Sequence, residues 1–69
     1  MIKCNLSSLM GRDRKNIQDV CNETGLARNT VANLYHDRAK RVDYETMDKL
    51  CRMFQCTIGE LYEFDRQRE

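Results

Sequence analysis

The chain has 69 residues, which limits it to one domain, and its formal net charge is +1. A domain of this size has a marginal core that would gain stability from dimerisation. No stretch reaches the roughly 18 apolar residues of a membrane span, and the opening MIKCNLSSLM lacks the apolar segment of a signal peptide, so we expect a cytoplasmic protein. The four cysteines show no C-x-x-C spacing, and the chain has a single histidine. We therefore expect the cysteines to act as small apolar residues, and we expect neither a metal nor a cofactor.

The apolar residues follow a helical period along most of the chain. The first predicted helix begins after Asn5 as N-cap and ends near residues 12–14. Its inward residues are Leu6, Leu9 and Met10. The second helix begins after Asn16, with Asp19 favourable in its positive first turn, and it ends at Gly25, which accepts a left-handed conformation. Its inward residues are Ile17, Val20, Cys21 and Thr24.

Three further helices are expected along the chain. Leu26 restarts the pattern, and a third helix is predicted from about Ala27 to Tyr35, followed by a loop over 36–41. Asp43 is the expected cap of a fourth helix, whose inward residues would be Met47, Leu50, Cys51 and Phe54. Thr57 and Glu60 form a T-x-x-E capping box, which opens a short fifth helix with Ile58, Leu61 and Tyr62.

The two ends of the chain do not fit helices. MIKC at the start and YEF near the end read as extended segments, which could pair as a short ribbon within one chain or across a dimer. The predicted fold is therefore all-α, with five helices, a possible terminal ribbon and a single domain over 1–69.

The stretch 17–36 meets the packing demands of a helix-turn-helix motif. Cys21 is small where the two helices cross, Gly25 accepts a positive φ, and Leu26 anchors the turn. The apolar contact between the helices would come from Val20, Val31 and Leu34.

The third helix separates a polar face from an apolar one, because each residue turns it by about 100°. One arc holds Arg28, Asn29, Ala32 and Asn33; the opposite arc holds Ala27, Val31 and Leu34, with Tyr35 at the border. Arginine can form two hydrogen bonds with O6 and N7 of guanine, and asparagine can form two with N6 and N7 of adenine. An alanine methyl can contact the methyl group of thymine. We therefore expect the polar arc to read bases in the DNA major groove. The alternative is a solvated face, although two asparagines are weak helix formers for one.

Phosphate contacts are expected from residues that surround this helix. The candidates are Arg14, Lys15, Asn16, Gln18, Thr30, His36, Arg38, Lys40 and Arg41, with Arg12 beside them. Residues 11–41 carry seven basic and four acidic groups, whereas 42–69 carry four basic and seven acidic, an asymmetry that favours nucleic acid as the partner. Each of these side chains could instead be solvated.

The chain resembles the Cro/phage-repressor type (XRE-like) of helix-turn-helix regulator, a family of five-helix DNA-binding domains. The resemblance lies in MIKCNLSSLM, IQDVCNETGLARNTVANLY and VDYETMDKLCRMFQCTIGELYEF, which cover nearly the whole chain. The family's base-reading positions are matched by Arg28, Asn29 and Asn33. Three positions depart from it: Ile17 replaces a phosphate-binding glutamine, Ala27 a frequent serine cap, and Tyr35 a frequent glutamate.

These observations predict a sequence-specific double-stranded DNA-binding transcriptional regulator, a repressor that acts as a homodimer on a palindromic operator in a bacterial cytoplasm, encoded by a bacterium or a phage. The expected dimer surface is Met1, Ile2, Ile58, Tyr62 and Phe64. The alternative is an antitoxin or another protein-interaction module on the same scaffold. No residue pairing or phosphate loop points to an enzyme or a small-molecule ligand, and RNA binding lacks a row of stacking aromatics.

Overall fold

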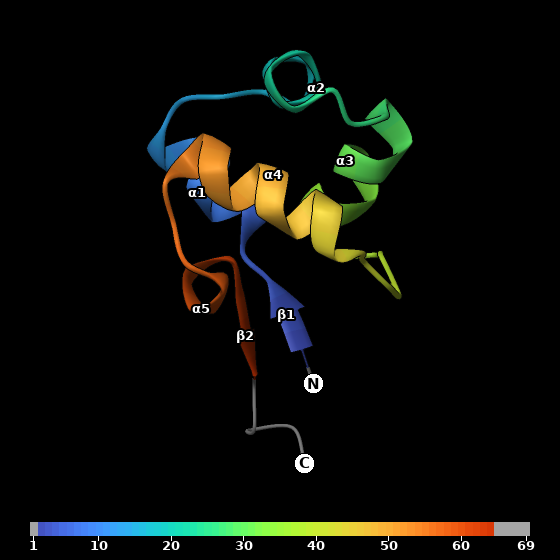
Figure 1. Cartoon of the computed structure of the whole chain (residues 1–69), viewed down its shortest axis with the longest axis vertical. Coiled ribbons are helices and arrows are strands. Elements are labelled where there is room, and N and C mark those ends of the chain that lie inside the picture. The colour runs from blue at the N-terminus through green and yellow to red at the C-terminus, as the bar shows by residue number, and fades with distance from the viewer. Residues whose placement is uncertain (1, 65–69) are drawn as a thin grey trace.

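In a computed structural model of the chain, which describes residues 2–64, five helices pack around one core and the chain ends pair as a short ribbon (Figure 1). The helices are α1 (Leu6–Arg12), α2 (Ile17–Thr24), α3 (Arg28–Tyr35), α4 (Tyr44–Phe54) and α5 (Ile58–Leu61). The strands are β1 (Ile2–Cys4) and β2 (Tyr62–Phe64). The predicted fold, five helices with a terminal ribbon, is confirmed.

The core draws residues from all five helices and from β1. Its buried members are Cys4, Leu6, Leu9, Met10, Val20, Val31, Leu34, Leu50, Phe54 and Leu61. A fully buried leucine or valine side chain contributes about 1.5–3 kcal/mol relative to an exposed one. The expected inward residues of α1 are all buried, whereas Met47 and Cys51 of α4 are only half-buried.

Three predicted helix caps are confirmed. The Asn16 side chain accepts the N–H of Asp19 at 2.8 Å, while the Asp19 carboxylate accepts the N–H of Asn16 at 3.0 Å. Thr57 and Glu60 form the same reciprocal box at the start of α5. Asp43 accepts the N–H of Thr46 at 2.8 Å, and hydrogen bonding to Thr46 lowers the pKa of that carboxyl.

Gly25 ends α2 as predicted, with a φ of 77° and its N–H donated to the carbonyl of Cys21 at 2.8 Å. The structure corrects three details of the sequence analysis. Asn5 precedes α1 but its side chain makes no cap hydrogen bond. Ala27 is exposed, because it lies before the first turn of α3 in an extended conformation, where the helical wheel does not apply. Tyr62 begins β2 and does not extend α5.

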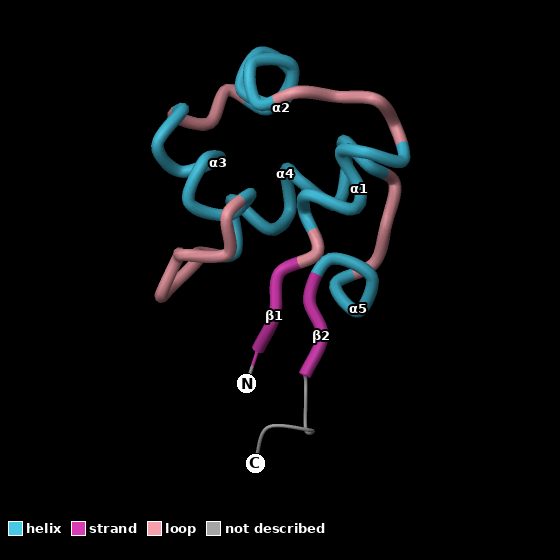
Figure 2. The backbone as a smooth tube through the Cα atoms, turned by 180° about the vertical axis from the view of Figure 1, so that it is seen from behind, coloured by secondary structure: helices cyan, strands magenta, loops and turns pink. Residues whose placement is uncertain are grey.

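The ribbon is antiparallel and forms within one chain, with Ile2 opposite Phe64 and Cys4 opposite Tyr62 (Figure 2). It projects from the end of the molecule that lies away from α2 (Figure 2). The backbone N–H of Cys4 donates to the Asp37 carboxylate at 3.2 Å, which ties the ribbon to the loop after α3. Cys4 is buried, and the other three cysteines are half-buried free thiols. Within residues 2–64, no helix has the length and hydrophobicity needed to cross a bilayer.

Candidate nucleic-acid interface

The exposed face of α3 carries the polar residues singled out in the sequence. Arg28, Asn29 and Asn33 are exposed and Ala32 is half-buried. On the opposite side, Val31 is 0% and Leu34 is 2% exposed. The structure therefore places four candidate base-reading residues on one outward face and anchors that face through two buried side chains.

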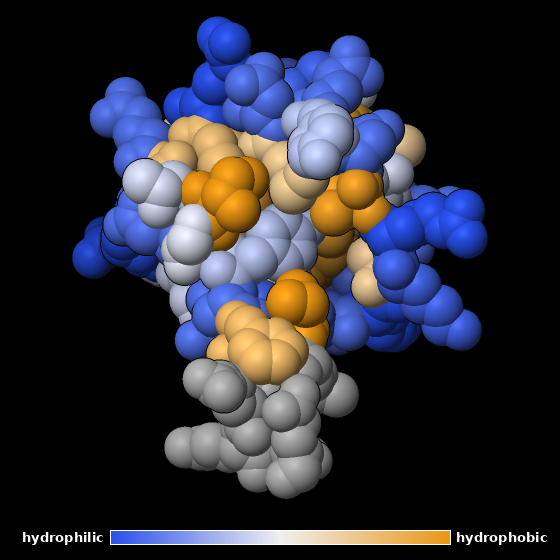
Figure 3. Space-filling model, turned by 60° about the horizontal axis from the view of Figure 1, so that its bottom comes forward, coloured by the Kyte–Doolittle hydropathy of each residue, from blue (hydrophilic) through white to orange (hydrophobic). Residues whose placement is uncertain are grey.

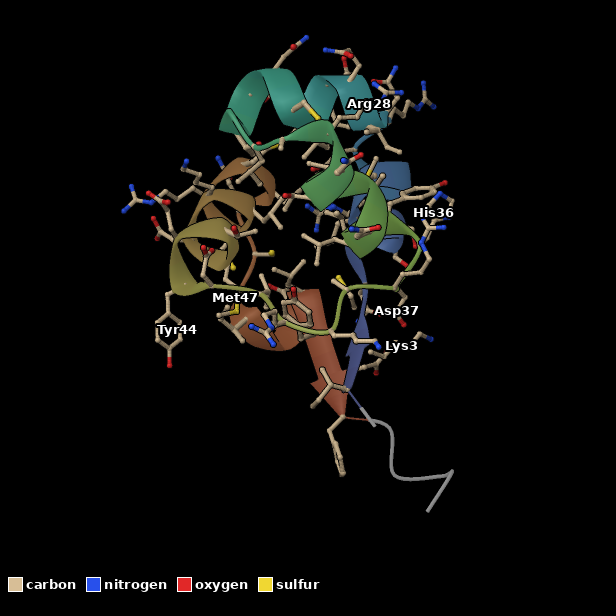
Figure 4. All side chains as sticks on the ribbon, turned by 90° about the vertical axis from the view of Figure 1, so that its right-hand side faces the viewer. Lys3, Arg28, His36, Asp37, Tyr44 and Met47 are labelled. Carbon is tan, nitrogen blue, oxygen red and sulfur yellow. The ribbon has the colours of Figure 1, made fainter. Side chains whose placement is uncertain are left out.

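Arg28, at the start of α3, is held by a side chain from α2. Its Nη1 donates to Oε1 of Gln18 at 3.1 Å, and Nε2 of Gln18 donates to Oδ1 of Asn22 at 2.9 Å. Figure 4 shows Arg28 at the end of α3 nearest α2. Asn22 is not among the residues predicted from the sequence, although its i, i+4 spacing from Gln18 places both side chains on one face of α2.

The start of α2 offers several donors to an anion. The side-chain Oδ1 of Asn16 accepts the cap hydrogen bond from Asp19, so the side-chain Nδ2 of Asn16 can donate to an anion. The backbone N–H groups of Ile17 and Gln18 lie in the first turn, where a helix supplies no acceptor. Lys15 lies close by, but its Nζ is 3.0 Å from Glu23 Oε2, and hydrogen bonding to Glu23 raises the pKa of Lys15.

Two surface hollows flank α3. One, of about 460 Å³, is lined by Met10, Lys15, Asn16, Ile17, Gln18, Arg28 and Tyr35. The other, of about 510 Å³, borders Thr30 and Asn33 on the helix and Arg38, Lys40 and Arg41 in the loop. Because Arg28 and Thr30 point to opposite flanks of α3, the candidate phosphate-binding residues lie on both sides of its exposed polar face.

The loop after α3 is shaped by two backbone features. Asp37 adopts a φ of 56°, and the N–H of Arg38 donates to the carbonyl of Asn33 at 2.8 Å, which closes the end of the helix. The basic residues Arg38, Lys40 and Arg41 are all exposed. His36 is also exposed and lies edge-on against the ring of Tyr35, with centroids 5.0 Å apart.

Two basic residues before α2 have different surroundings. The Arg12 guanidinium donates to the Phe54 carbonyl at 2.8 Å and to Asp13 at 2.9 Å, so it joins the end of α1 to the end of α4. Its hydrogen bonds lower the pKa of the Asp13 carboxyl. Arg14 is exposed with a φ of 56°. Of this pair, only Arg14 presents its side chain to solvent without a role in the scaffold of residues 2–64.

Apolar side chains are exposed away from α3. Ile2 and Phe64, which oppose each other in the ribbon, are 63% and 53% exposed, and Ile58 is 50% exposed. Figure 3, which views the molecule from the end that carries the ribbon, shows apolar surface there, surrounded by hydrophilic residues. Tyr62 is half-buried; its hydroxyl finds no hydrogen-bond partner among the residues described, and burial raises its pKa. Of the expected dimer surface, Met1 lies outside the described residues.

One of three comparisons with known proteins identifies a family for the chain. No characterised protein sequence and no solved structure matches the chain significantly. A family model does match, over residues 5–67, and thus includes all five helices. The chain therefore belongs to the family of Cro/C1-type helix-turn-helix DNA-binding domains.

Proposed function

We propose that the protein is a transcriptional repressor that reads a specific double-stranded DNA sequence through α3 and acts without catalysis. The observation that supports this proposal best is the outward row of Arg28, Asn29 and Asn33 on the second helix of the motif. Arginine and asparagine make bidentate hydrogen bonds with guanine and adenine edges, each worth about 1–3 kcal/mol of discrimination. Ala32 lies between them and would contact a thymine methyl.

Phosphate contacts on both flanks of α3 would fix its orientation in the groove. On the α2 side, the proposed ligands are Arg14, Lys15, Asn16 and Gln18; on the loop side they are Thr30, His36, Arg38, Lys40 and Arg41. Most of these proposed phosphate ligands line the two hollows that border α3. Since DNA lies in the cytoplasm of a bacterium, or of the bacterial host of a phage, the protein would act there.

A homodimer on a palindromic operator follows from the size of the interface. One α3 spans only a few base pairs, and repressors of this kind pair two copies on half-sites about one helical turn apart. The exposed pair Ile2 and Phe64, together with Ile58 and Tyr62, is the proposed dimer surface, which Met1 would extend. It is supported by exposed apolar area on the end of the molecule that lies away from α2.

The test begins with selection of binding sites from randomised duplexes, followed by titration of the enriched duplex against a scrambled one. We expect Asn29→Ala and Asn33→Ala to weaken binding to the enriched duplex by roughly 5- to 150-fold, because each removes a bidentate base contact. Arg41→Ala should weaken binding to both duplexes and lower the salt slope by about 0.9. Arg52→Ala is the control, since its partner is Asp48 on α4 and it lines neither hollow.

Failure to enrich any sequence would contradict the proposed base reading, and an enriched site without two-fold symmetry would contradict the homodimer.

One observation favours a second function, a protein-interaction module such as an antitoxin. A groove of about 320 Å³ on α4 and α5 is lined by Tyr44, Met47, Asp48, Cys51 and Ile58. Tyr44 is 87% exposed there, and Figure 4 shows it projecting from the start of α4. Absence of DNA binding at low salt would make this groove the leading site.

A further inference from the structure

The head group of Arg28 belongs to a chain of three side chains that spans the two helices of the motif. Gln18 accepts from Arg28 at 3.1 Å and donates to Asn22 at 2.9 Å. We propose that Gln18 is a positioning residue that orients Arg28 for guanine, and that Asn22 fixes the direction in which the Gln18 amide points. This inference rests on the proposed base reading by α3.

The direction of the chain follows from the chemistry of its members. A guanidinium can only donate hydrogen bonds, so the Gln18 amide attracts it only when its carbonyl oxygen faces Arg28. The amide nitrogen of Gln18 then points away from Arg28 and finds Oδ1 of Asn22. A reversed Gln18 amide would place an N–H₂ group against the guanidinium and an oxygen against the acceptor of Asn22. With Oδ1 of Asn22 turned toward Gln18, as in this structure, Arg28 and Asn22 favour the same orientation of the Gln18 amide.

Such a contact would order Arg28 before DNA binds and would leave its base contact and its charge intact. Arginine loses more rotamer entropy than most side chains when it is fixed, and a side chain ordered before binding loses less at the moment of binding. The bond to Gln18 uses one of the five guanidinium N–H groups, which leaves four for the paired contact with guanine O6 and N7. Gln18 is neutral, so it holds Arg28 without cancelling the charge that attracts DNA.

The same chemistry distinguishes two substitutions of Gln18. Gln18→Ala releases Arg28. Gln18→Glu replaces the amide with a carboxylate that would pair with Arg28 and reduce its positive charge. Residue 18 lies in the first turn of α2, where a negative charge is favourable, so Gln18→Glu should leave the fold intact. A loss of guanine preference in this variant would therefore not reflect unfolding.

Asn22 offers a matched pair of substitutions. Asn22→Ala removes the acceptor for the Gln18 amide, whereas Asn22→Asp keeps an oxygen at that position. We expect Asn22→Ala to reduce discrimination and Asn22→Asp to retain it. The added charge of Asn22→Asp would weaken binding to all duplexes alike.

The experiment has one measurement without DNA and one with it. In the free protein, the NMR order parameter of the Arg28 Nε–Hε bond should fall in Gln18→Ala. With DNA, the critical base pair is the one at which Arg28→Ala loses its preference for guanine. There, Gln18→Ala and Gln18→Glu should each reduce that preference by roughly two- to tenfold, the range for one side-chain hydrogen bond.

The outcomes separate this inference from the function on which it rests. If the wild-type protein enriches no sequence, base reading itself fails, and the inference with it. If Arg28→Ala loses a guanine preference but both Gln18 variants keep it, only the positioning role is overturned. An unchanged Arg28 order parameter in Gln18→Ala would overturn the contact directly. Arg38→Ala is the control, since it should weaken binding without changing the preference at that base pair.

Discussion

The two helices of the DNA-binding motif have the same length but are held in opposite ways. Each end of α2 carries a residue suited to its backbone: Asn16 forms a capping box and Gly25 takes the left-handed turn. Neither end of α3 does so. Ala27 offers no side-chain cap, and Asp37, which is not glycine, adopts a φ of 56° after the helix. The stronger tertiary anchor, however, belongs to α3, which buries two core residues where α2 buries one.

The difference shows how a small domain can present polar side chains on a helix. Asparagine is a poor helix former, so Asn29 and Asn33 lower the intrinsic stability of α3. Packing of Val31 and Leu34 compensates for that cost, since most helical stability in proteins comes from tertiary contacts. The stability of α2 thus rests on local capping signals, whereas that of α3, the helix proposed to read bases, rests on the core beneath it.

The largest expected effect comes from removing that anchor. Leu34→Ala should lower the free energy of unfolding by about 2–5 kcal/mol, the range for a buried leucine that leaves a cavity. A domain this small could unfold entirely, so Leu34→Met, which conserves volume, provides a second variant with an expected cost of less than about 1.5 kcal/mol. Urea denaturation measures both, and a loss of less than about 1 kcal/mol in Leu34→Ala would contradict the tertiary anchor.

The adjacent residue supplies the matched control. Asn33→Ala removes an exposed polar side chain and substitutes a better helix former, so the free energy of unfolding should stay constant or rise slightly. The same variant is expected to bind the enriched duplex roughly 5- to 150-fold more weakly. Together, Leu34→Ala and Asn33→Ala would separate the face of α3 that maintains the fold from the face proposed to read bases.

The second comparison concerns the turn between the helices. A Cβ added at Gly25 or at Gly11 would meet no atom within 4 Å, but only Gly25 has a positive φ. Gly25→Ala should therefore cost about 1–2 kcal/mol of unfolding free energy through backbone strain alone. Gly11→Ala, inside α1, should gain roughly 0.5–1 kcal/mol because alanine favours a helix. Equal effects of the two substitutions would show that the left-handed turn does not limit stability.

The features that could be predicted from the sequence are the ones that depend on neighbouring residues. The caps at Asn16 and Thr57 and the turn at Gly25 were predicted correctly, because each depends on residues only three or four positions apart. The wheel of α3 also predicted its buried side through Val31 and Leu34. Such signals involve residues close together in the chain, so they can be recognised in a single sequence.

Contacts between distant segments could not be predicted in this way. The bond from Arg12 to the Phe54 carbonyl joins residues 42 positions apart, and that from Arg28 to Gln18 crosses the turn. In the sequence, Arg12 shows only its positive charge, which is why it appears beside the candidate phosphate ligands. The ribbon was expected from its extended ends, but its register, with Ile2 opposite Phe64, requires α1 and α5 to bring both ends together.

The smallest expected effects concern the helix starts. Asn16→Ala should cost about 1 kcal/mol of unfolding free energy, because the first turn of α2 loses its side-chain acceptor. The matched change in α3 is Ala27→Ser. Ala27 already has the extended φ and ψ of an N-cap and is exposed, so a serine there can accept an N–H from the first turn without moving the backbone.

We expect Ala27→Ser to gain up to about 1 kcal/mol of unfolding free energy. Amide hydrogen exchange should slow at the start of α3 and stay constant in α2. If exchange at the start of α3 is already as slow in the wild type as in α2, α3 does not lack local stability and the contrast between the helices is wrong. If Ala27→Ser slows exchange and leaves DNA binding unchanged, the cap affects stability alone. Tighter binding would instead show that ordering the start of α3, where Arg28 lies, costs free energy when the protein binds DNA.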